Sequence, residues 1–77
     1  MVRLKQIEIG DNVASAAYFP EDNNTGGFLK IDLSTGEVIE HTMVDGFSFN
    51  YVYHAAKELK RIAINNEHPS ESVTMWY

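Results

Sequence analysis

Three side chains in the second half of the chain have types and spacing that could hold a metal ion. His54 and Glu58 are four residues apart, so a helix would project both from one face, and His68 follows later in the chain. A solvated surface pair has the same spacing, and no third ligand stands at a fixed distance from the first two. We therefore expect no metal site, no catalytic residue and no cofactor. The alternative function is a small metal-dependent hydrolase with these ligands, or a histidine-based one that pairs His41 with a carboxylate.

The stretch DGFSFNYV, residues 45–52, has alternating aromatics after a glycine, as in the base-stacking strand of an RNA recognition motif. Two features disagree with that motif: Asp45 replaces its basic residue, and a helix begins within the stretch. We therefore expect Phe47 and Phe49 to pack in the core. A single-stranded RNA binder is the second alternative, and its cations would come from one helical face: Lys57, Lys60 and Arg61.

Four further aromatic side chains are the candidate partner-binding residues: Tyr51, Tyr53, Trp76 and Tyr77. A helix places Tyr51 and Tyr53 about 200° apart, so at least one of them should face water or a partner. Tyrosine and tryptophan are enriched at the energetic centres of protein interfaces. The pattern favours a surface that binds another protein or a second copy of the chain.

Composition narrows the classes of partner. The chain has 77 residues, no cysteine and a net charge of −5, which suits one small acidic domain without disulfides. Negative charge argues against nucleic-acid and anionic membrane partners. The opening MVRLKQIEIG has no apolar signal region, and the longest apolar stretch, VASAAYF, is too short to span a bilayer. We expect a cytoplasmic protein.

Alternating apolar residues and turn signals predict two hairpins in the first half of the chain. The predicted strands are residues 3–9, 13–19, 28–33 and 37–42. In the second hairpin we expect Ile31 to face Ile39, which would place His41 on the same inner face.

From about Asn50 the apolar period becomes that of a helix of about 15 residues. Its apolar stripe consists of Val52, Ala55, Ala56, Leu59, Ile62 and Ala63. Ser48 or Asn50 can cap its start, Asn65-Asn66 can end it, and the terminal VTMWY is strand-like. The predicted fold is a single two-layer α+β domain over residues 1–77, with an antiparallel sheet of four to five strands in a meander of hairpins, one helix on one face, and the order βββ-β-α-β.

The segments GGFLKIDLSTGEVIE, AAKELKRIAINNEHP and VTMWY resemble, in their layout, a group of small uncharacterised proteins from Gram-positive bacteria and their phages. The likeness covers residues 18–77 and rests on a turn glycine, a helical stripe and a tail strand. It implies small size and a cytoplasmic location, and no activity or functional residue.

Sparse catalytic groups and a small domain favour a non-enzymatic function. We expect an accessory or regulatory module that acts through protein–protein contact, with another protein or with itself as a homodimer.

Overall fold

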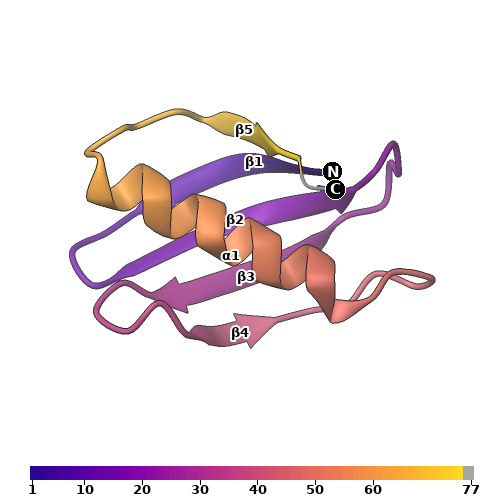
Figure 1. Cartoon of the computed structure of the whole chain (residues 1–77), viewed down its shortest axis with the longest axis horizontal. Coiled ribbons are helices and arrows are strands. Elements are labelled where there is room, and N and C mark those ends of the chain that lie inside the picture. Colours follow the sequence, from indigo (N-terminus) through magenta and orange to yellow (C-terminus); the bar gives the residue numbers. More distant parts are fainter. Residues whose placement is uncertain (76–77) are drawn as a thin grey trace.

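The computed structural model describes residues 1–75, which form five strands and one helix (Figure 1). In chain order these are β1 (Val2–Ile9), β2 (Val13–Pro20), β3 (Gly27–Asp32), β4 (Val38–His41), α1 (Phe49–Ile64) and β5 (Glu71–Thr74). No helix in this part of the chain has both the length and the apolar character needed to cross a membrane.

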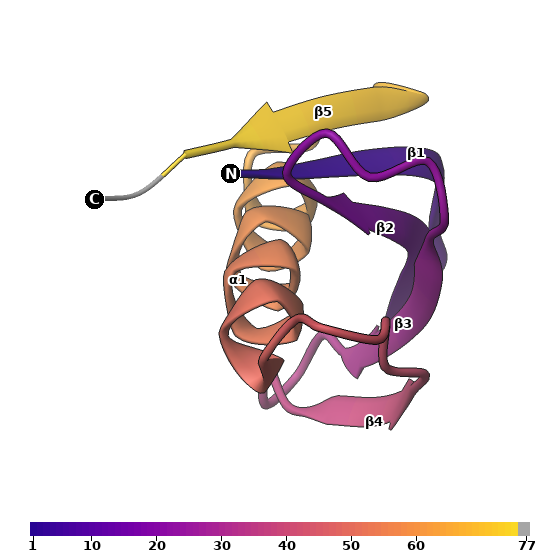
Figure 2. The same cartoon turned by 90° about the vertical axis from the view of Figure 1, so that its right-hand side faces the viewer.

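The strands form one antiparallel sheet in the order β4-β3-β2-β1-β5. The first four strands follow one another as a meander, and β5 returns after the helix to pair with β1. Helix α1 covers one face of this sheet and runs obliquely over it from the β4 side toward the β5 side (Figures 1 and 2). The predicted two-layer α+β architecture is confirmed. Strand β5 begins earlier than predicted, and residues 76–77 of the predicted tail strand lie outside the described residues.

A bulge in β1 turns apolar residues of unlike parity toward the same core. Lys5 pairs with Ala17, but the next pair joins Glu8 to Ser15, so β1 has one residue more than β2 between these pairs. Gln6 takes the extra position with a φ of 54°. Because of this residue, Ile7 and Ile9 lie against the core that Leu4 enters from the other side of the bulge.

The β3–β4 hairpin has a different register from the predicted one. Ile31 lies opposite Val38, the register shifts beside that pair, and Ile39 is 52% exposed. The turn fixes this register, because Gly36, at a φ of 79°, donates its N–H to the Asp32 carbonyl over 2.7 Å. Val38 therefore takes the inward position that was predicted for Ile39.

The core lies between the sheet and one stripe of α1. Five of the six predicted stripe residues are buried, and Ala63 is half-buried. The buried members are Val52, Ala55, Ala56, Leu59 and Ile62. A helix of this length is only marginally stable alone in water, so packing of this stripe against the strands supplies most of its stability.

Both ends of α1 carry the predicted caps. The Ser48 hydroxyl accepts the Asn50 N–H over 3.3 Å at the start. At the end, Asn66 has a φ of 55°, and the N–H of Glu67 donates to the Ile62 carbonyl over 3.0 Å. With the bond from the Asn66 N–H to Ala63, this is a Schellman motif with asparagine in the left-handed position.

Two glycines at the start of β3 make room for aromatic rings of β2. A Cβ on Gly26 would lie 2.6 Å from the Phe19 ring, and one on Gly27 would lie 2.5 Å from the Tyr18 ring. The Tyr18 side chain is buried, and its hydroxyl donates to the Thr42 carbonyl over 2.7 Å. The glycine pair therefore lets one ring cross the strand on each face of the sheet.

We expect Gly27→Ala to lower the free energy of unfolding by about 1–3 kcal/mol, because the new methyl group meets a buried ring and a backbone carbonyl that have no room to move. Urea unfolding monitored by circular dichroism measures the change. Gly10→Ala is the control, since its nearest new contact is at 3.4 Å and its effect should be within about 0.5 kcal/mol. Equal losses in the two variants would contradict the role of the Tyr18 ring.

Candidate functional site

A groove of about 420 Å³ lies between α1 and the β3–β4 hairpin, and we call it the β4–α1 groove. Its volume is in the range of small-ligand and side-chain binding sites. The residues that line it are Gly36, Glu37, Val38, Phe49, Tyr53, Ala56, Lys57 and Lys60. The hairpin forms one wall, and a flank of the helix forms the other.

The helix wall follows from sequence spacing. Phe49, Tyr53, Ala56 and Lys60 are separated by four, three and four residues, which places them along one line on a helix. This line meets the buried stripe at Ala56 and lies on the side of the helix that faces β4. Residue type alone places Tyr53 with the other tyrosines and Lys60 with the other cations, whereas helical spacing is the sequence signal that joins the two.

Phe49 corrects the expectation that both phenylalanines of the 45–52 stretch are core residues. Phe47 is half-buried, and its ring meets the Tyr51 ring at 5.2 Å and 87°. Phe49 is 46% exposed. The reason is its position: it is the first residue of α1 and lies at the β4 side, where β4 is the edge strand and no further strand covers the ring.

Two exposed aromatic rings give the groove its apolar character. Tyr53 is 50% exposed, as expected for one of the two tyrosines, and Phe49 contacts the His41 ring edge-to-face at 5.3 Å. His41 thus sits at the end of β4 as an aromatic neighbour of the groove. Exposed rings beside a concave surface are typical of a contact site for another molecule.

Lysines mark the other end of the groove. The Lys57 amine lies 5.3 Å from the centre of the Tyr53 ring, and the Lys60 amine lies over Gly36 in the β3–β4 turn. Within residues 1–75, neither lysine belongs to an ion pair. Arg61, predicted to share their face, lines a second hollow with Lys57 and Glu58, and its guanidinium is paired with Glu58 and Glu67.

Tyr51, the other candidate on the helix, has a different environment. It is half-buried, and its hydroxyl donates to a carboxylate oxygen of Glu21 over 2.8 Å. That hydrogen bond raises the pKa of the Tyr51 phenol and contributes to the lowered pKa of Glu21. The structure therefore separates Tyr51 from Tyr53, and the candidates Trp76 and Tyr77 lie outside the described residues.

The candidate metal ligands are not brought together. No three histidine, aspartate or glutamate side chains within residues 1–75 lie close enough to hold a metal ion. His54 is near the middle of α1, whereas His68 lies in the connection between the end of the helix and β5. Burial, followed by the charge of Lys57, lowers the pKa of His54.

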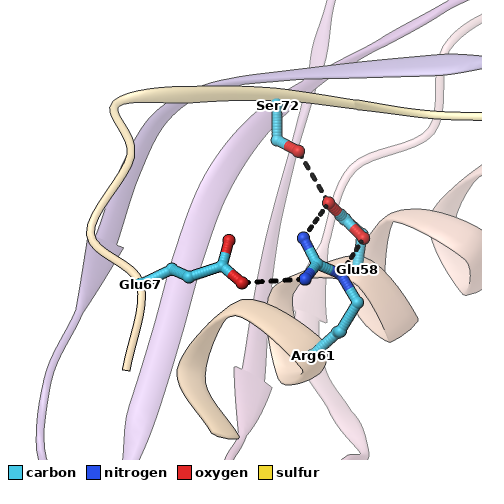
Figure 3. A network of polar contacts seen from close by, with 4 residues as sticks. All are labelled: Glu58, Arg61, Glu67 and Ser72. Carbon is cyan, nitrogen blue, oxygen red and sulfur yellow. Dashed lines mark hydrogen bonds and ion pairs between the residues drawn. The ribbon is translucent and has the colours of Figure 1, made fainter. Parts of the chain in front are cut away.

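Glu58 is committed to a polar network that ties α1 to β5 (Figure 3). Its carboxylate accepts two hydrogen bonds of 2.9 Å from the Arg61 guanidinium and one of 2.6 Å from the Ser72 hydroxyl. Arg61 also donates to Glu67 over 2.9 Å. These bonds, those from Arg61 first, hold the pKa of Glu58 below its ordinary range and raise that of Arg61. We assign this network a structural role, because the Arg61 guanidinium and the Ser72 hydroxyl already donate to carboxylates.

The sheet curves around α1, so its uncovered face is the outer one (Figure 2). Arg3 and Lys5 both lie over the Phe19 ring, at 5.5 and 5.7 Å from its centre, and Arg3 also donates to the Asn23 carbonyl over 2.8 Å. Phe28, also on this face, is 38% exposed. The groove is the stronger candidate for a binding site, because it is concave and two exposed rings line it.

The chain matches no protein-family model, no curated protein and no solved structure. The resemblance to small proteins of Gram-positive bacteria and their phages therefore stays an expectation from the sequence.

We expect Glu58→Gln to lower the free energy of unfolding at neutral pH by about 1–3 kcal/mol, because it removes charge from a side chain that is only 10% exposed and accepts three bonds. A carboxylate with a lowered pKa in the folded state stabilises the fold above its unfolded pKa of about 4.3 and loses that effect as pH falls through the folded value. The difference between wild type and variant should therefore shrink below about pH 4.

Urea unfolding at neutral pH and at about pH 3 tests this pH dependence. Glu67→Gln is the matched control, because Glu67 is 44% exposed and its pair with Arg61 should be worth at most about 1 kcal/mol. A Glu58→Gln effect that is as small as the control, or that stays constant with pH, would contradict the assignment.

Proposed function

We propose that this protein is a non-enzymatic protein-interaction module, accessory or regulatory in its role, which binds a partner protein at the β4–α1 groove. The observation that carries the proposal is the pair of half-exposed rings, Phe49 and Tyr53, in a groove of about 420 Å³. Within residues 1–75 eight large hydrophobic side chains are exposed, and these two are the ones that line the groove together. Exposed rings gathered at a concave site favour contact with another molecule.

The chemistry around the groove supports binding over catalysis. Its lining residues include no histidine, serine, threonine or aspartate. Within residues 1–75 the carboxylate of Glu37, the one acidic lining residue, forms no hydrogen bond or ion pair. A general acid or base needs a partner within hydrogen-bonding reach that orients it. The hydrolase and RNA-binding alternatives stay predictions, and neither gains support from this arrangement.

A cytoplasmic location belongs to the same proposal. A chain without cysteine forms no disulfide, so an oxidising compartment would add nothing to its stability. The cytoplasm contains nucleic acids, which bind basic proteins non-specifically. An acidic module keeps its surface open to protein partners there.

The test is a selection of peptides of about twelve random residues, displayed and captured on the wild-type protein. We expect the selected peptides to bind the Phe49→Ala/Tyr53→Ala double variant about tenfold or more weakly, because large rings at the centre of an interface supply most of its affinity. Fluorescence anisotropy with each labelled peptide measures the dissociation constant.

Phe28→Ala is the matched control, since Phe28 is also an exposed ring but lies on the opposite face of the sheet. Its affinity for the peptides should equal that of wild type. Failure to select any binder, or binders that respond to Phe28→Ala and ignore the groove variant, would overturn the proposed function.

A further inference from the structure

Charge at the groove is the opposite of the charge of the whole molecule. The chain has 11 acidic against 6 basic residues, yet two of the basic residues, Lys57 and Lys60, lie at this one groove. Glu37 is the single acidic residue among the lining residues, so the local balance is positive. A positively charged site on an otherwise negative surface attracts an anionic partner electrostatically.

The acidic residue of the helix is bonded elsewhere, so it forms no ion pair with the two lysines. Glu58, the only acidic residue within α1, points to the β5 side, where it binds Arg61 and Ser72. Neither Lys57 nor Lys60 reaches a carboxylate within residues 1–75. The Lys57 amine lies over the Tyr53 ring and the Lys60 amine lies over Gly36 of the β3–β4 turn. Glu37 is the one acidic residue that lines the groove with them, so two positive charges face one negative charge.

Resting on the proposed function, we propose that the partner segment at the β4–α1 groove is an acidic peptide with a large apolar anchor. The anchor side chain packs between Phe49 and Tyr53, and carboxylates that flank it meet Lys57 and Lys60. Burial of the anchor supplies most of the affinity, whereas the charge pairs select the partner and speed its association.

Charge also distinguishes this occupant from a second copy of the chain. Each copy carries a net charge of −5, so self-association has to overcome repulsion between two acidic molecules. A strand added to the free edge of β4 is disfavoured too, since β4 has four residues, a register shift and two nearby glutamates, Glu37 and Glu40. The groove, and not the strand edge, is the surface that fits an acidic segment.

The experiment repeats the peptide selection on two proteins, wild type and the Lys57→Glu/Lys60→Glu variant. Peptides from wild type should be enriched in aspartate and glutamate next to a large apolar residue, and should bind the reversed variant about tenfold or more weakly. The reversed variant should select lysine-rich and arginine-rich peptides around the same kind of anchor. Wild-type affinity should also fall several-fold when the salt concentration rises from about 50 to about 300 mM.

Lys5→Glu/Lys30→Glu is the control for total charge, because it changes the net charge equally on the uncovered face of the sheet. Its selected peptides should match those of wild type. Circular dichroism checks that each variant keeps its fold, which we expect because all four lysines are at least partly exposed.

The outcomes separate the two proposals. Peptides that need Phe49 and Tyr53 but carry no excess of acidic residues would overturn the acidic partner and leave the interaction module standing. The absence of any groove-dependent peptide would overturn both. A dimer in light scattering that Lys57→Glu/Lys60→Glu dissociates would assign the groove to a second copy and overturn the acidic peptide of another protein.

Discussion

The contact of Tyr18 with Gly27 and Thr42 is the interaction on which the geometry of the groove depends. The ring starts in β2, crosses β3 where a glycine leaves room, and donates to the carbonyl just after β4. It thereby fixes where β4 ends and where the connection to α1 begins. Val44 is buried in that connection, and the capping residue Ser48 follows. The position of Phe49, and so of the groove wall, therefore depends on a ring of β2, which is two strands away from β4 in the sheet order.

A single helix over a five-stranded sheet cannot cover every strand equally. An α-helix with its side chains is about 10 Å wide, whereas five strands at about 4.8 Å spacing span roughly twice that width. The oblique path of α1 lets it reach both edges, with its first turn at β4 and its polar network at β5 (Figures 1 and 3). The cost is a flank of the helix that stands away from β4. The groove therefore exists because a single helix covers a sheet that is wider than the helix.

The elements could be predicted from the sequence, and the site could not. Period-two and period-3.6 patterns are local, so the hairpins, the buried stripe of α1 and the Asn66 stop were available from neighbouring residues. The exposure of Phe49 depends on which strand lies at the sheet edge, and the inward turn of Val38 in place of Ile39 depends on turn geometry. The first is a tertiary feature, and the second is set by the exact geometry of the β3–β4 turn, where the Gly36 N–H donates to the Asp32 carbonyl. The bulge at Gln6 was equally hidden, although Leu4 and Ile7, with unlike parity and like chemistry, hinted at it.

Different sides of α1 contribute to the stability of the fold and to the proposed binding site. The buried stripe holds the helix on the sheet, and the β5 side consumes its charges in the bonds between Glu58, Arg61 and Ser72. The β4 side combines the rings of Phe49 and Tyr53 with two lysines that form no ion pair within residues 1–75, against one acidic lining residue. If Glu58 lay one helical turn away on that flank, its charge would cancel theirs. Placing the only acidic residue of the helix toward β5 thus anchors the last strand and keeps the groove positive, so one choice of position serves both the fold and the proposed partner.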